Sequence, residues 1–317
     1  MVLKQNRIFR FLVAWMNRHF PVMLTRLRFK MYFGRMMNVK NPQDLNEKIL
    51  WLSLFSDTTE WSRLTDKYAV RQYVEDVGGA EYLVKLYGKW DRVEDIEWDK
   101  LPDKFVLKCN NGGSANAVKI VRDKSLLNIE ELKQTMRGWL TKEMSPDQTE
   151  YHYIDVKPCI IAEQLLENPE SIKAISNTLI DYKIWCFNGK VSEIWTCANR
   201  TLDGADVATF DLLWNYHPEG SVFTKDYNKQ KQLVPKPKNL DVMISLAEKL
   251  SAPFPVVRVD LYNIGGKVYF GEMTFTSNGG IMDFYTQEHL LELGRQIDLS
   301  GIKKDRINRP HKPKYLQ

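Results

Sequence analysis

Hydrophobic and polar positions recur along the chain with two different periods. In four segments, apolar side chains return every three or four residues, which is the spacing of a helix with one buried face. These segments are residues 5–37 with a break at Pro21, a segment capped by Thr65 or Asp66 and ended by Gly78 and Gly79, residues 129–140, and residues 240–250.

Shorter runs alternate with the two-residue period of a β-strand. They cover residues 82–90, 104–110, 117–121, 159–166, 181–187, 190–197, 255–262 and 267–274. The turn residues Asn188 and Gly189 join two of these runs into a predicted hairpin, and Gly265 and Gly266 join another pair. Antiparallel hairpins mixed with packing helices predict an α+β fold.

The last predicted hairpin carries the most informative polar side chains. Arg258, Asp260 and Tyr262 share one face of its first strand because side chains alternate. A three-residue loop would place Glu272 opposite Arg258 with Asp260 one step away, whereas a two-residue loop would turn Glu272 to the other face. Two carboxylates and an arginine on one face suit magnesium with substrate phosphates. A cross-strand salt bridge on a solvated face is the alternative.

A second candidate site follows the predicted strand at residues 104–110. Lys108 ends this apolar run, and a loop rich in glycine, serine and asparagine follows it. A lysine charge beside a loop of backbone N–H donors is suited to phosphate binding. The alternative is an ordinary glycine-rich turn. The candidate phosphate-binding residues are Lys108, Asn111, Gly112, Gly113 and Ser114.

Residues 160–167 form a third candidate site, a strand that runs from apolar into polar sequence. Backbone N–H and C=O groups at such a strand end can pair with the edge of an adenine ring. A strand that simply runs into a loop is the alternative.

Charge is distributed unevenly along the chain. Residues 1–40 contain nine Lys or Arg and no acidic residue, whereas the formal net charge of the whole chain is +5. The basic character belongs to this arm and not to the body, so the sequence predicts no nucleic-acid partner. Large apolar residues interleave with the cations. We expect either peripheral contact with an anionic membrane or a lipid-linked glycan, or packing of the arm on the body.

Other features narrow the protein class. Four cysteines without metal-ligand spacing are typical of free thiols in a reducing setting. The longest apolar run near the start, residues 11–16, is too short for a signal-peptide core or a membrane span. The sequence therefore predicts a cytoplasmic protein, at most peripheral to the inner face of a membrane.

In their order along the chain, these motifs resemble the ATP-grasp superfamily. More narrowly they are similar to the TupA-like (teichuronopeptide biosynthesis) ATP-grasp family of bacterial surface-polysaccharide clusters, whose members are often labelled glycosyltransferases. The motifs that carry the resemblance are residues 41–51, 65–71, 104–110, 181–183, 186–190, 254–262 and 270–276.

The resemblance implies two α+β subdomains that grip ATP, preceded by an atypical helical segment. We expect a basic helical segment at residues 1–60, a subdomain with the phosphate loop at 61–175, a subdomain with the metal site at 176–300, and a tail at 301–317.

The resemblance also implies roles for single residues. Lys67 and Lys108 would reach the ATP phosphates under the loop at residues 111–116. Glu163, Gln164 and Leu166 would hold adenine, and Asp181 the ribose, with Glu170 as the alternative. Lys183 and Arg200 would lie near the transferred phosphoryl group, with Arg258 as a phosphate clamp.

Asp260 and Glu272 match the magnesium ligands of the family. Most ATP-grasp ligases have an asparagine two residues after the metal-binding glutamate. Here that position is Thr274, a weaker ligand, and Asn278 is a possible substitute.

The activity implied is an ATP- and magnesium-dependent carboxylate–amine ligase that acts through an acyl phosphate. The polysaccharide context suggests a sugar uronate as the carboxylate and an amino acid or amine as its partner. The alternatives are a glycosyltransferase, although the chain contains no Asp-x-Asp motif, a sugar kinase on the same fold, or a non-catalytic nucleotide-binding subunit.

Overall fold

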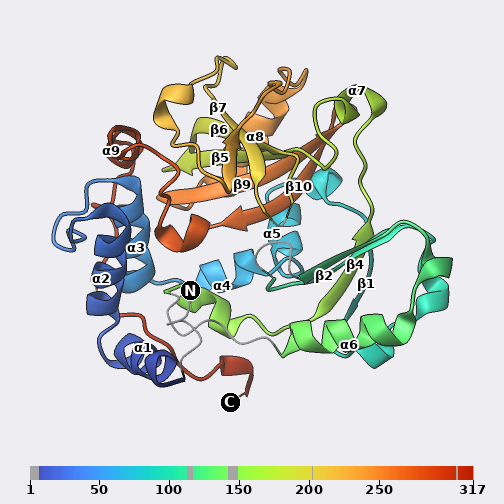
Figure 1. Cartoon of the computed structure of the whole chain (residues 1–317), viewed down its shortest axis with the longest axis horizontal. Coiled ribbons are helices and arrows are strands. Elements are labelled where there is room, and N and C mark those ends of the chain that lie inside the picture. The colour runs from blue at the N-terminus through green and yellow to red at the C-terminus, as the bar shows by residue number, and fades with distance from the viewer. Residues whose placement is uncertain (1–6, 113–116, 142–148, 202, 305, 317) are drawn as a thin grey trace.

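The protein forms an α+β fold built on two sheets that lie side by side (Figure 1). The computed structural model describes residues 7–112, 117–141, 149–201, 203–304 and 306–316. The predicted fold class is confirmed, and the predicted hairpins and amphipathic helices are found close to their expected bounds.

The smaller sheet has four antiparallel strands in the order β1-β4-β2-β3. Helix α6 packs against β2, where Phe105 and Leu107 meet Leu132 and Met136 in a separate apolar core. The elements are β1 (Leu86–Trp90), β2 (Phe105–Cys109), β3 (Val118–Val121), α6 (Ile129–Leu140) and β4 (Ile160–Gln164).

The larger sheet has six strands in the order β10-β9-β5-β6-β7-β8, and only the β7–β8 pair is parallel. Helix α8 packs on one face of β5, β6 and β9, and the opposite face carries the polar side chains described below. The elements are β5 (Asp181–Phe187), β6 (Lys190–Ala198), β7 (Ala205–Phe210), β8 (Tyr227–Lys229), α8 (Leu240–Ser251), β9 (Val256–Ile264) and β10 (Lys267–Thr274).

Two helices at the N-terminal end confirm the predicted break at Pro21. Helix α1 covers Arg7–His19 and α2 covers Pro21–Phe33, so the proline occupies the first turn of α2, where its missing N–H costs no hydrogen bond. Helix α3 (Leu45–Phe55) lies between α2 and α9 (Gln287–Arg295). Its N-cap is Asp44, whose carboxylate accepts from the Glu47 amide at 2.8 Å.

Three short helices lie between the longer elements: α4 (Thr59–Thr65) and α5 (Val70–Asp76) precede β1, and α7 (Glu170–Lys173) lies between β4 and β5 along the chain. The helix expected to be capped by Thr65 or Asp66 starts later, as α5, with Ala69 at its N-cap position and no side-chain cap. The Asp66 carboxylate accepts from the Tyr68 and Ala69 amides at 2.8 and 3.1 Å in the turn before this helix. All four cysteines are buried free thiols, as expected. Within the described ranges, no helix is both long and apolar enough to cross a membrane.

Candidate nucleotide and metal site

The β9–β10 hairpin turns through a two-residue loop, the second of the two loop lengths considered from the sequence. Ile264 pairs with Lys267, and Gly265 and Gly266 between them have φ of +60° and +87°. These angles fit the tight turn that matches strand twist, which glycine adopts without strain. By alternation alone, such a turn would direct Glu272 away from Asp260.

A β-bulge between Phe270 and Glu272 reverses this outcome. Beyond the bulge, Glu272 lies directly opposite Asp260, and Thr274 lies opposite Arg258. Gly271 occupies the bulge, where an added Cβ would come within 2.9 Å of the Asp260 carbonyl oxygen. The two predicted metal carboxylates therefore share one face, although Arg258 is not opposite Glu272 as the three-residue loop would have required.

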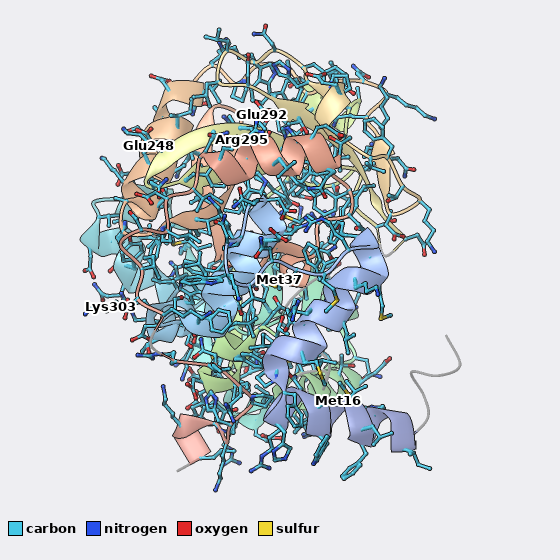
Figure 2. All side chains as sticks on the ribbon, turned by 90° about the vertical axis from the view of Figure 1, so that its left-hand side faces the viewer. Met16, Met37, Glu248, Glu292, Arg295 and Lys303 are labelled. Carbon is cyan, nitrogen blue, oxygen red and sulfur yellow. The ribbon has the colours of Figure 1, made fainter. Side chains whose placement is uncertain are left out.

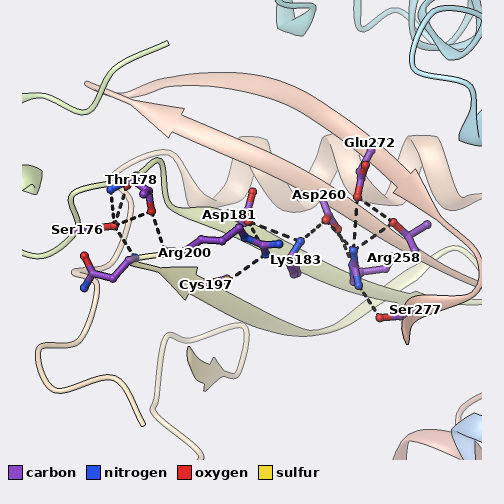
Figure 3. Close-up of polar contacts among 12 residues, drawn as sticks. Ser176, Thr178, Asp181, Lys183, Cys197, Arg200, Arg258, Asp260, Glu272 and Ser277 are labelled. Atoms are coloured by element: carbon purple, nitrogen blue, oxygen red, sulfur yellow. Dashed lines mark hydrogen bonds and ion pairs between the residues drawn. The ribbon is translucent and has the colours of Figure 1, made fainter. Parts of the chain in front are cut away.

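Arg258 contacts both of these carboxylates, as the dashed lines in Figure 3 show. Its Nε and Nη2 atoms donate to the two oxygens of Asp260 at 2.6 and 2.8 Å. Nη2 also lies 3.7 Å from Glu272 Oε1, so both carboxylates have the same guanidinium as a neighbour. Thr274 accepts from Arg258 at 3.1 Å, and Ser277 accepts from its Nη1.

Strand β5 adds a second cation to the same face. Lys183 pairs across the sheet with Asp260, and its ammonium group ion-pairs with that carboxylate. Asp181, one pleat away, lies 3.8 Å from the Lys183 ammonium and 2.8 Å from Arg200 Nη2. The structure thus brings together the three predicted carboxylates of the larger sheet and three predicted cations, as Figure 3 shows.

Lys67 reaches this cluster from outside the larger sheet. It lies between α4 and α5, and its backbone N–H donates to the Asn110 carbonyl at 3.1 Å. Its ammonium donates to the Gly112 carbonyl at 2.8 Å and lies 3.1 Å from Glu272 Oε2. We call the seven residues that meet here the ion cluster: Lys67, Asp181, Lys183, Arg200, Arg258, Asp260 and Glu272.

Lys108 lies on the smaller sheet and is fixed by its neighbour on β4. Its ammonium lies 2.8 Å from Glu163 Oε2, and Arg71 lies 3.2 Å from the other oxygen of Glu163. Glu163 is buried, so these two cations compensate its charge. The Glu163 side chain therefore positions Lys108 in this structure, and its expected contact with adenine stays a prediction.

The other residues predicted to bind adenine, ribose or phosphate do not gather at one point in the structure. Gln164 is exposed at the end of β4, and Leu166 is buried just after it. Glu170 is exposed and ion-pairs with Lys173, whereas Asp181 is engaged by Arg200. Asn111 accepts from the Cys109 thiol at 3.0 Å. Gly113 and Ser114 lie outside the described residues, so their predicted role stays a prediction.

Electrostatics keep Glu272 ionised. Burial raises the pKa of its carboxyl, but Lys67, Lys183 and Arg258 outweigh burial and lower the pKa well below the ordinary value. The pKa of the Arg258 guanidinium is raised, since burial disfavours its charge but Asp260 outweighs that effect. Both groups are therefore charged across the physiological range.

The acidic pair fits magnesium better than a metal that demands more protein ligands. Within the described ranges, no group of three or more His, Cys, Asp or Glu side chains is placed to hold a metal ion. Magnesium takes one or two carboxylates and completes its coordination with phosphate oxygens and water. Asp260 and Glu272, adjacent across β9 and β10 on a polar face, have the donor chemistry for such an ion.

Two cavities that share lining residues lie beside α4 and the C-terminal tail. The first, of about 210 Å³, lies between α4, residues 151–155 and the C-terminal tail, and is bordered by Arg306, Arg309 and Lys314. The second, of about 340 Å³, shares Ser62 and Lys314 with the first and extends to Asp66, which precedes Lys67. Basic and hydroxyl side chains line both cavities together with carboxylates, which are Asp57 and Asp155 in the first and Asp66 and Asp155 in the second, so both cavities suit a polar ligand.

Several residues of the site carry no sequence signal that predicts their place. Arg71 and Ser277 are separated by long stretches of chain from the partners that they contact, Glu163 and Arg258. Tyr153 is half-buried and lies close enough to Glu150 and Glu272 that both, together with burial itself, raise the pKa of its hydroxyl. Arg71 belongs to the motif at residues 65–71, but that motif does not predict its contact with Glu163.

Comparison with known sequences decides the family. A sequence model of the TupA-like ATPgrasp family matches residues 47–298, which is most of the chain. The chain belongs to the TupA-like ATP-grasp family. The resemblance seen in the sequence is thereby confirmed, and this family is one of ATP-grasp ligases, which typically join carboxylates to amines at the expense of ATP. No match was found among curated proteins.

Solved structures of similar fold are distant in sequence. D-alanine–D-alanine ligase from Bacillus anthracis is 19% identical with a TM-score of 0.47, over 77% of this chain and 70% of that one. L-amino acid ligase from Bacillus licheniformis is 16% identical with a TM-score of 0.41, over 70% of this chain and 43% of that one. The ATP-grasp ligase PsnB, solved with Mg and ADP, is 10% identical with a TM-score of 0.39, over 70% and 53%.

Proposed function

We propose that this member of the TupA-like ATP-grasp family is a carboxylate–amine ligase that acts through an acyl phosphate. The observation that carries the proposal is the pairing of Asp260 with Glu272 across the bulge, surrounded by Lys67, Lys183 and Arg258. Magnesium, when bound to the two carboxylates, would orient the phosphates and neutralise their charge. The protein's contribution is positioning and charge, as in other phosphoryl transfers.

The reaction needs two steps. A carboxylate oxygen attacks the terminal phosphorus of ATP, the bond to ADP breaks, and an acyl phosphate forms. An amine then attacks the acyl carbon, loses a proton, and displaces inorganic phosphate. Lys183, Arg200 and Arg258 can offset the negative charge that develops in both steps, and no covalent protein nucleophile is required.

We propose a sugar uronate as the carboxylate, activated for surface-polysaccharide biosynthesis. The suggestion rests on the family context. The two cavities are polar, and their hydroxyl and basic side chains, which lie beside carboxylates, offer hydrogen-bond partners to the hydroxyl and carboxylate groups of such a sugar. Ser62 borders both cavities and is half-buried, so Ser62→Leu should raise the KM for the carboxylate substrate several-fold. Thr135→Leu, on the exposed face of α6, is the matched control and should leave KM unchanged.

One assay separates the ligase from its rivals. Purified protein is incubated with ATP, magnesium and a panel of uronic acids, with hydroxylamine in place of the amine. A ligase yields ADP and a hydroxamate in equal amounts, because hydroxylamine traps acyl phosphates. ADP with a stable phosphorylated sugar and no hydroxamate would instead identify a kinase. Transfer of a sugar from a nucleotide sugar without ATP would identify a glycosyltransferase.

A further inference from the structure

Helices α1 and α2 expose an apolar face that the fold does not use. Among the described residues, half of the exposed large hydrophobic side chains lie between positions 8 and 36. On α2, Met23, Leu27 and Met31 are 47%, 40% and 83% exposed and follow one stripe at helical spacing. Large exposed apolar patches mark interaction surfaces.

The opposite side of α2 already supplies its contact with the body. Pro21, Thr25 and Phe29 are buried there, at a spacing of four residues. The outer stripe is therefore not explained by packing of the arm on the body, which was one of the two expectations from the sequence. Figure 2 shows both helices on the outside of the molecule, with the side chains of α1 projecting away from it.

The exposed faces of the two helices are continuous. On α1, Phe11 and Leu12 are 69% and 51% exposed, and Trp15 follows them one turn later at 46%. The Trp15 ring lies 5.6 Å from that of Phe20, at the junction where α2 begins. The insertion face can thus be defined as Phe11, Leu12, Trp15, Phe20, Met23, Leu27 and Met31.

Unpaired cations surround the insertion face. Arg10, Arg18 and Lys30 are exposed, and none of them forms an ion pair with a described residue. Arg35 alone among the described basic side chains of the arm is paired, with Asp44 and Glu47. Because residues 1–40 contain no acidic side chain, a second copy docked on the same face would bring cations against cations. The charge pattern favours an anionic occupant.

We propose that the insertion face binds the surface of an anionic lipid bilayer. Apolar side chains on one helical face with arginine and lysine beside them are the composition of helices that lie in the membrane interface. The inference is independent of the proposed chemistry.

The test is sedimentation of the full chain with vesicles of phosphatidylcholine alone or with 30% phosphatidylglycerol. The protein should pellet with the anionic vesicles at low salt, release at high salt, and stay in solution with the neutral ones. Met23→Ser with Leu27→Ser should reduce pelleting at least tenfold, as should Arg18→Glu with Lys30→Glu. Both pairs are exposed, so circular dichroism should remain that of the unchanged chain.

Matched controls come from exposed positions elsewhere. Leu126→Ser with Leu213→Ser, and Lys225→Glu with Lys231→Glu, should pellet like the unchanged chain. Equal binding to both lipids, or binding that survives the serine pair, would overturn the proposal. Absence of binding also overturns it, and a dimer in analytical ultracentrifugation that the serine pair dissociates would assign the face to a second copy.

Discussion

The ammonium group of Lys67 contacts both halves of the site: it donates to the Gly112 carbonyl beyond β2 and lies 3.1 Å from Glu272 on β10. This lysine therefore joins the loop that follows β2 to one of the two predicted metal ligands. The predictions below test the two sides separately.

Glu272→Gln should lower kcat roughly 100-fold or more, because a neutral amide is a poor ligand for magnesium and no longer offsets Lys67. The circular dichroism spectrum should be unchanged, since Glu272 is partly exposed and lies on the polar face. Turnover is measured as ADP release at saturating ATP. If Glu272→Gln retains full activity, the magnesium assignment is wrong.

Lys108→Gln should weaken ATP binding by about 1–3 kcal/mol, the worth of a charge-assisted hydrogen bond. Glu163 keeps Arg71 as a partner in this variant, so the melting temperature should change little. Lys119→Gln on β3 is the control, because Lys119 is exposed on the same sheet. Isothermal titration with ATP and magnesium measures the affinity of both variants, and equal affinities would leave Lys108 only a structural partner of Glu163.

Gly271→Ala should destabilise the protein by about 1–3 kcal/mol, because its Cβ would press on the Asp260 carbonyl and force the bulge to shift. Activity should fall with it, since the bulge places Glu272. Gly138→Ala is the contrasting control: nothing lies within 4 Å of its Cβ position on α6, so it should stabilise the helix by about 1 kcal/mol. Thermal melts followed by circular dichroism compare the two.

The protonation of His289 should make the free energy of unfolding depend on pH. Burial lowers the pKa of its imidazole, but the contact with Glu193 at 2.8 Å outweighs burial and raises the pKa above the ordinary 6.5. A raised pKa in the folded state contributes stability that is complete below pH 6.5 and is lost as the pH rises through the folded value. His289→Gln should abolish this part of the slope. Melts in steps from about pH 5.5 to 8.5 measure it, and parallel curves would refute the assignment.

Much of the site followed from alternation and order along the chain. Arg258 and Asp260 share one face as expected, because strand alternation fixes the face of each side chain. Lys67 and Lys183, which the family resemblance singled out, meet them there, Lys183 from β5 and Lys67 from the turn between α4 and α5. The face on which Glu272 lies did not follow from the sequence. It depends on a bulge that adds one residue to β10 and so shifts its pairing with β9. Gly271 was the available signal, because glycine inside a strand often marks a bulge.

Helix α3 shows a different limit of prediction. Ten of its eleven residues are buried, so it has no polar face to give a helical period. The sequence signal for this helix is at its N-terminus, where Asp44 stands three residues before Glu47, the spacing of an N-terminal capping motif. Contacts such as Arg71 with Glu163 lie beyond pattern analysis, because they depend on how helix and sheet meet.

The ion cluster contains three carboxylates and four basic side chains, each already facing an opposite charge. If Asp260 and Glu272 hold magnesium as proposed, Lys183 and Arg258 would exchange the Asp260 carboxylate for the nucleotide phosphates as their counter-ions. On that proposal, metal and nucleotide should bind cooperatively, since each would supply the charge that the other sets free.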